Sequence, residues 1–142
     1  LTRYTSSPAY LVSVDSEQAA ECADRLQEAD ATECSAQTWE ICRIEAGFPE
    51  YGKDITEKQL PQEVGRNQTA INFNKGCYLG QETVARIDAL GHVNWHLVGV
   101  RCEGSTIPSA GDEFRSKDRS IGSVTSACFS PRLGMPLAMG YV

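Results

Sequence analysis

Apolar positions recur at helical spacing in three stretches of the chain, residues 16–29, 35–47 and 81–90. Each stretch therefore predicts a helix with one apolar face. Ser35 is a good N-cap residue for the second helix, and Gly47 is a typical residue just beyond its end. The first helix is expected to begin at Asp15 or Ser16.

Shorter apolar stretches predict strands, and most of them lie late in the chain. Two early candidates are residues 9–14, which have β-branched ends, and residues 70–73, which alternate between apolar and polar side chains. Three later candidates are residues 95–100, 122–129 and 137–142, separated by glycines and prolines. Short strands at this spacing are typical of a small barrel or sandwich.

The combined pattern predicts an α+β fold with a boundary near residue 93. Residues 1–93 form the helical and mixed part, and residues 94–142 form a small antiparallel barrel. The chain starts without methionine and stops inside a predicted strand. We therefore interpret it as a fragment, incomplete at both ends.

Composition narrows the function classes. The 142 residues are 41% hydrophobic and 23% charged, an ordinary globular balance, with a net charge of −6. The negative charge argues against direct nucleic-acid binding, which needs a basic face. No apolar run approaches the ~20 residues of a membrane span, and the N-terminus carries Ser, Thr and Pro where the apolar segment of a signal peptide would lie. Neither a membrane nor a nucleic-acid partner is expected.

The six cysteines contain no C-x-x-C pair and no cluster with histidine. The spacing therefore predicts neither a zinc site nor an iron–sulfur ligand set. Without a secretory signal, we expect reduced thiols and a cytoplasmic location.

The segment 75–82, KGCYLGQE, carries the most informative chemistry. Cys77 lies just ahead of a predicted helix N-terminus, where the helix dipole and Lys75 favour a thiolate. The competing interpretation is a buried structural cysteine in a tight turn. No histidine partner is assigned, because His92 and His96 lie beyond the helix.

Glu45 is a second candidate residue. It is predicted at the C-terminal end of its helix, where a carboxylate faces the unfavourable end of the dipole. Such a carboxylate can accept hydrogen bonds from a heterocycle with adjacent N–H groups. The simpler alternative is a surface ion pair with Arg43 or Lys53.

The segment 75–82 resembles the K-G-C-[FY]-x-G-Q-E signature of the YgfZ family. Further segments resemble the wider superfamily of the glycine-cleavage T-protein, an aminomethyltransferase, and they occur in family order from about residue 35: residues 43–52, residues 60–63, and residues 122–126 with 130–131 and 140–142. One departure is clear, because T-proteins usually carry I-G-K-E where residues 79–82 read LGQE.

The resemblance implies a folate-binding α+β domain followed by the T-protein type of C-terminal barrel, in a fragment that lacks the N-terminal part. It implies a tetrahydrofolate-type cofactor and a role in supporting the assembly or repair of iron–sulfur clusters, and so of tRNA-modifying enzymes. The implied protein partners are iron–sulfur enzymes or assembly factors. Cys77 is then the functional thiol. The implied folate-binding residues are Glu45, Lys75, Gly76, Tyr78 and Gln81.

Two other functions remain open at the level of the sequence. One is a tetrahydrofolate-dependent aminomethyltransferase, favoured by Glu45 and the superfamily segments. The other is an interaction module in which a partner docks on the barrel. Trp39 and Trp95 are expected to be ordinary core residues.

Overall fold

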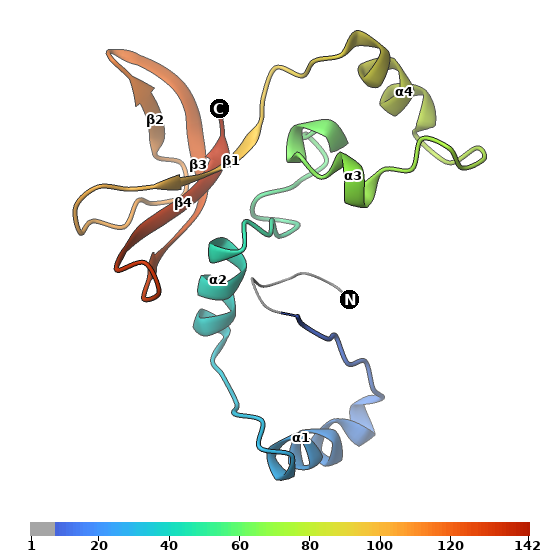
Figure 1. The fold of residues 1–142 in the computed structure, drawn as a ribbon, viewed down its shortest axis with the longest axis vertical. Helices are drawn as coiled ribbons and strands as arrows, with labels where there is room; N and C mark the ends of the chain where they lie inside the picture. The colour runs from blue at the N-terminus through green and yellow to red at the C-terminus, as the bar shows by residue number, and fades with distance from the viewer. Residues whose placement is uncertain (1–7) are drawn as a thin grey trace. The chain divides into compact units, whose positions relative to one another are not determined.

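The computed structural model describes residues 8–142 of the chain (Figure 1). The chain divides into two compact units, Leu1–Phe48 and Pro49–Val142. The domain boundary near residue 93 stays a prediction.

The first unit contains a short 3-10 turn, η1 (Ser16–Gln18), and the helices α1 (Ala19–Glu28) and α2 (Ala36–Glu45). The Ser35 hydroxyl accepts a hydrogen bond from the Thr38 N–H at 3.2 Å, so the predicted N-cap of α2 is confirmed. Gly47 adopts the left-handed conformation, with φ of 64°, and the chain leaves the helix there.

The predicted strand at residues 9–14 is wrong. Residues 10–14 are irregular, and Ala9 alone forms a bridge. Tyr10 is 82% exposed and Leu11 is 77% exposed, so the apolar side chains that suggested a strand are not buried. A strand needs a paired neighbour along its length, and local apolar character does not provide one.

The second unit begins with three helical segments, η2 (Pro61–Val64), α3 (Asn67–Ala70) and α4 (Gln81–Leu90). The bounds of α4 agree with the predicted helix. The predicted strand at residues 70–73 is wrong, because Ala70 ends α3 and residues 71–73 pair with no strand.

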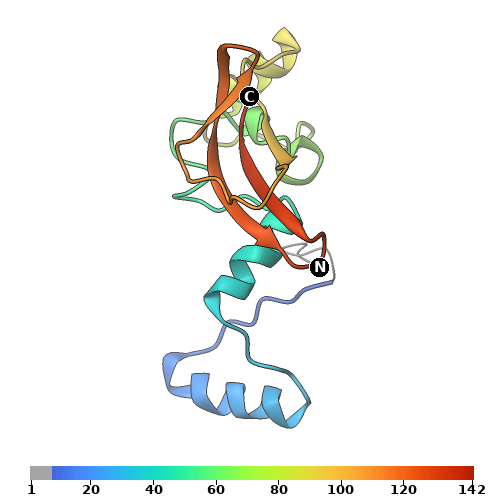
Figure 2. The same ribbon diagram turned by 90° about the vertical axis from the view of Figure 1, so that its left-hand side faces the viewer.

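Four strands follow and form one antiparallel sheet in the order β1-β4-β3-β2 (Figure 1). Their bounds are β1 (Leu97–Arg101), β2 (Glu113–Ser116), β3 (Arg119–Ser130) and β4 (Met135–Tyr141). Figure 2 shows the long β3 and β4 side by side, and they pair from Ser123–Tyr141 to Ser130–Met135. The α+β class is confirmed. Within the described residues the sheet is open, and β2 is a strand that the sequence pattern did not reveal.

The core of the second unit lies along the central strands. Six consecutive residues of β4, from Pro136 to Tyr141, are buried. From β3, Val124 and Cys128 are buried as well. The two middle strands of a four-stranded sheet have neighbours on both edges, which explains why burial concentrates there.

A buried aspartate joins the loop before η2 to this sheet. Asp54 is 1% exposed, accepts the Glu50 N–H at 3.0 Å, and accepts the hydroxyl of Thr125 on β3. The Tyr141 hydroxyl donates to the Asp54 carbonyl at 2.9 Å. Burial, with the charges of Glu63 and Asp54, raises the pKa of Tyr141 to about 12, so the phenol keeps the proton that it donates.

No helix within residues 8–142 has the length and apolar character needed to cross a membrane.

Candidate functional site

The predicted reactive loop lies between α3 and α4 in the second unit. Residues 71–80 are irregular, and Cys77 is an exposed thiol within them. Gly80 adopts the left-handed conformation, with φ of 83°, directly before α4 begins at Gln81. The position of Cys77 ahead of this helix follows the sequence interpretation, and the alternative of a buried structural cysteine does not hold.

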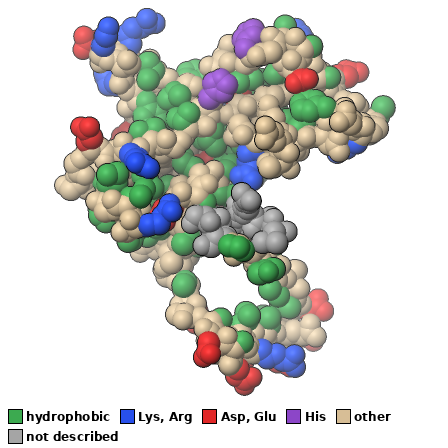
Figure 3. Space-filling model, in the orientation of Figure 1, with side chains coloured by type: hydrophobic (Ala, Val, Ile, Leu, Met, Phe, Trp, Pro, Cys, Tyr) green, Lys and Arg blue, Asp and Glu red, His purple; other side chains and the backbone are tan. Residues whose placement is uncertain are grey.

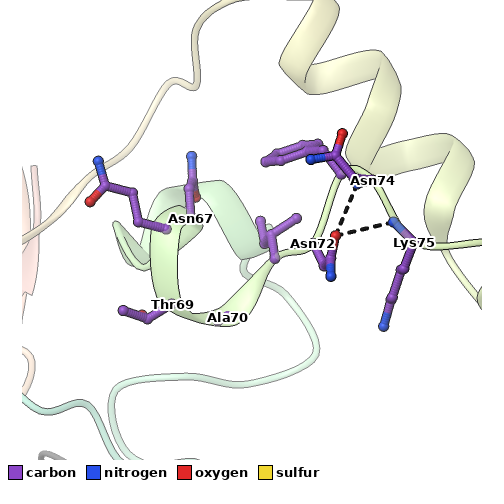
Figure 4. A pocket seen from close by; sticks show the side chains of 9 residues that line it. Asn67, Thr69, Ala70, Asn72, Asn74 and Lys75 are labelled. Carbon is purple, nitrogen blue, oxygen red and sulfur yellow. Dashed lines mark hydrogen bonds between the residues drawn. The ribbon is translucent and has the colours of Figure 1, made fainter.

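A side-chain cap fixes the first half of this loop. The Asn72 side-chain oxygen accepts the backbone N–H of Asn74 at 2.9 Å and that of Lys75 at 3.1 Å (Figure 4). Such a turn replaces hydrogen bonds that a strand or helix would otherwise supply.

Lys75 and Tyr78 contact each other across the loop. The Lys75 ammonium lies 4.5 Å from the centroid of the Tyr78 ring, which is a cation–π geometry. The loop therefore presents a positive charge beside an aromatic ring. That combination suits a ligand that has both a flat ring and an anionic group.

Two neighbouring cavities use this segment. One, of about 310 Å³, is lined by Lys75, Tyr78 and Gly80 of the loop together with residues of η2, α3 and α4. The other, of about 510 Å³, is lined by residues 67–75 (Figure 4). Lys75 lines both, whereas Gly76, Cys77 and Gln81 line neither. The structure thus brings two of the predicted ligand residues to one cavity.

A buried hydrogen bond supports the wall of the smaller of these cavities. Gln62 of η2 donates its side-chain amide to the Val84 carbonyl of α4 at 2.9 Å. Gln62 and Val84 are both buried, at 7% exposure each. Because η2 and α4 are short, this hydrogen bond helps to hold the two helical segments together.

Glu45 belongs to the first unit, where it is the last residue of α2 and is partly buried. The arginine proposed as its surface partner, Arg43, pairs with Glu40 at 2.8 Å, and Lys53 pairs with Glu50 at 3.0 Å. The predicted role of Glu45 in ligand binding stays a prediction.

A larger cavity of about 600 Å³ involves residues that sequence reasoning missed. Trp95 and Tyr141 line it, together with Lys58 and Glu63. Trp95 is 47% exposed and Trp39 is 43% exposed, so the expectation that both are ordinary core residues is wrong. This cavity forms because the sheet places β4 next to β3. Its lining residues are far apart in the sequence, so no local motif predicts it.

The cysteines differ in exposure. Cys34 and Cys77 are exposed, whereas Cys128 is buried, and all six are thiols rather than disulfides. Burial raises the pKa of the Cys102 thiol and so disfavours its nucleophilic thiolate form. Within residues 8–142, no group of three or more His, Cys, Asp or Glu side chains is arranged to hold a metal ion.

Comparison with known proteins places these features in a family context. Residues 96–142 match the family model of the glycine cleavage T-protein C-terminal barrel domain. The chain is similar to an aminomethyltransferase of Nostoc sp., with 31% identity over 141 residues. That match covers 99% of this chain and 37% of the relative. An aminomethyltransferase of Streptomyces avermitilis is 33% identical, and that match covers 99% of this chain and 40% of the relative.

A solved structure agrees with these matches. The glycine cleavage system aminomethyltransferase T from Bartonella henselae superposes with a TM-score of 0.78 at 26% identity. The match covers 89% of this chain and 36% of that chain. The chain therefore spans well under half the length of the relatives that it matches.

Proposed function

We propose that the protein binds a tetrahydrofolate-type ligand, because the chain is related to the glycine-cleavage T-protein superfamily. Its strands lie in the part of the chain that matches the C-terminal barrel domain of that superfamily. We propose further that it takes part in folate-dependent transfer of an aminomethyl-derived one-carbon group. The observation that carries this proposal is similarity to aminomethyltransferases along 99% of the chain rather than along the barrel alone.

The residues of the loop fit such a ligand. A folate combines a flat pterin, an aromatic linker and a tail with carboxylates. The Tyr78 ring offers an aromatic surface, and the Lys75 ammonium offers a positive charge for a carboxylate. A cavity of about 310 Å³ lies at the small end of the usual range for ligand pockets, so it suits one part of a folate rather than the whole.

In this proposal Glu45 recognises the pterin. A carboxylate accepts two adjacent N–H groups at once, which fixes the plane and orientation of the heterocycle. Tetrahydrofolate supplies the two nitrogens that accept the one-carbon unit, one in the reduced pterin ring and one in the amine that links the pterin to the aromatic linker. The protein's own contribution is to orient these nitrogens and to exclude water around them.

The binding step has a direct test. Calorimetric titration of tetrahydrofolate into the intact protein is expected to show binding that Glu45→Gln weakens by about tenfold or more, since hydrogen bonds to a charged group contribute ~1.5–3 kcal/mol. Glu33→Gln is the matched control, because Glu33 is an exposed glutamate of the same unit. Equal affinity in the wild type and Glu45→Gln would remove Glu45 from the site, and no binding at all would remove the proposal.

The transfer step is tested separately. Intact protein is incubated with tetrahydrofolate and an aminomethylated carrier protein, and methylenetetrahydrofolate is measured. Formation that depends on the protein supports transfer. Folate binding without turnover would leave a binding protein and exclude the aminomethyltransferase activity.

The exposed thiol favours a second candidate function. Cys77 is exposed on the loop that carries the YgfZ-like signature. It lines neither of the two cavities beside this loop. We therefore propose, as the alternative, a folate-binding accessory protein that supports iron–sulfur enzymes through Cys77.

This alternative predicts a phenotype in cells. Cys77→Ala is expected to lower the activity of iron–sulfur enzymes, because the accessory role depends on the thiol. Cys34→Ala, which removes another exposed thiol, is the matched control and should leave those activities unchanged. Normal enzyme activity in the Cys77→Ala strain, with the variant protein present at wild-type abundance, would argue against the iron–sulfur role.

A further inference from the structure

A small cavity of the second unit shares only Asn67 with the cavities described above. It measures about 160 Å³ and lies where α4 and the residues after it meet η2 and α3. Its polar lining residues are Gln62 and Asn67, together with Asp88, His92 and His96. None of its lining residues lines the Lys75 and Tyr78 cavity. Both histidines are on the surface in the space-filling view (Figure 3).

Two buried acceptors in its lining have no hydrogen-bond partner. Gln62 is 7% exposed, and donation from its Nε2 to the Val84 carbonyl fixes the orientation of the amide. The Gln62 Oε1 is therefore an acceptor by necessity, and it is buried without a partner. The Asn67 Oδ1 is also a buried atom without a partner, although the Asn67 side chain as a whole is only partly buried. Acceptors in this state are destabilising unless a donor reaches them.

The chemistry of the lining selects the kind of donor. Asp88 contributes a carboxylate, and no lysine or arginine lines the cavity. The described residues hold no cluster suited to a metal ion. At about 160 Å³ the space is well below that of a pocket for a drug-sized ligand, so the occupant is small.

We propose that this cavity binds the ammonium group of a small primary amine. An ammonium has three N–H donors and no acceptor, which matches two amide oxygens and one carboxylate. The charge of Asp88 makes the site favour a cation over a neutral donor. The amine is either a free small molecule or the side chain of a lysine, and both present the same group. The proposal does not rest on folate binding, because it uses none of Glu45, Lys75 and Tyr78, to which the folate contacts are assigned.

The first test is a titration followed by ¹H–¹⁵N correlation spectra of the intact, labelled protein. Methylammonium chloride is expected to give saturable shifts of the side-chain amide signals of Gln62 and Asn67. Tetramethylammonium chloride carries the same charge without N–H donors and is expected to leave them unchanged. Equal responses to both salts, or no saturable response to methylammonium, would overturn the proposal and indicate that water alone satisfies the two acceptors.

The second test uses variants whose amide does not hold the fold. Asn67→Ala is expected to weaken methylammonium binding by about tenfold, and Asn67→Asp to strengthen it, because a carboxylate attracts the cation more than an amide. Gln68→Ala, at an exposed neighbouring position, is the control. Unchanged affinity in both Asn67 variants would also overturn the proposal. A tighter response to Nα-acetyl-lysine methylamide than to methylammonium would assign the source as a lysine side chain, and the reverse order would assign a free amine.

Discussion

Gly140→Ala is expected to destabilise the protein by about 3 kcal/mol or to prevent folding, because a methyl group has no room between β3 and β4. A Cβ at this position would lie 2.1 Å from the Ser123 carbonyl oxygen and 2.6 Å from a ring carbon of Phe114. The first of these atoms is backbone, so a side-chain rotation cannot relieve the overlap. The two central strands would have to separate, with loss of their hydrogen bonds.

Gly99→Ala is the matched control for this experiment. Gly99 lies on β1, next to β4 in the same sheet, and a Cβ there would meet nothing within 4 Å. The substitution is therefore expected to be neutral or slightly stabilising, because alanine restricts the unfolded chain. Urea unfolding of the two variants gives the comparison. Equal stabilities would mean that the close approach of β3 to Gly140 does not exist in solution.

Asp54→Ala is expected to lower the free energy of unfolding by about 3 kcal/mol, because it removes a buried acceptor from the Glu50 N–H and leaves the Thr125 hydroxyl only the Met139 carbonyl, at 3.2 Å. The Glu50 N–H and the Thr125 hydroxyl both donate to this carboxylate. Asp24→Ala is the control, since Asp24 is exposed on α1, and its effect is expected to stay within about 0.5 kcal/mol.

A double-mutant cycle with Thr125→Val separates this hydrogen bond from general damage to the loop. Once Asp54 is alanine, removing the Thr125 hydroxyl is expected to cost much less than it does in the wild type. The coupling is measured by urea unfolding of the wild type, both single variants and the double variant. Strictly additive effects would show that Asp54 and Thr125 do not interact.

These two predictions concern the same structural relationship. The predicted site loop and the cavity at Trp95 and Tyr141 both belong to the second unit. The central strands of the sheet in that unit are β3 and β4. Asp54 holds the segment before η2 against this sheet, and Gly140 permits the strands to approach. Folate binding is therefore expected to be lost with either substitution, because each disturbs the fold. Glu45→Gln tests binding more directly, because glutamine has nearly the same shape as glutamate.

Local signals in the sequence determined several features of the protein. Ser35 caps α2 because its hydroxyl reaches the Thr38 N–H within one turn. The bounds of α4 agree with the prediction, and glycine follows its last residue at position 91. The position of Cys77 ahead of α4 is also a local property, because Gly80 supplies the left-handed conformation directly before the helix. The sequence alone left open whether this thiol is exposed or buried, and the structure shows it exposed.

Only the tertiary structure decided which apolar stretches became strands. Residues 9–14 and 70–73 have strand-like patterns, but no neighbouring strand within the described residues runs along them, and Asn72 caps a turn instead. By contrast, β2 has a weak pattern, and it forms because β3 supplies a partner. The unpartnered acceptors of Gln62 and Asn67, and the cavity beside Trp95, likewise depend on segments distant in the chain. Helices satisfy their backbone hydrogen bonds within one segment, whereas strands and cavities need partners from elsewhere, and that difference separates what the sequence alone could determine from what it could not.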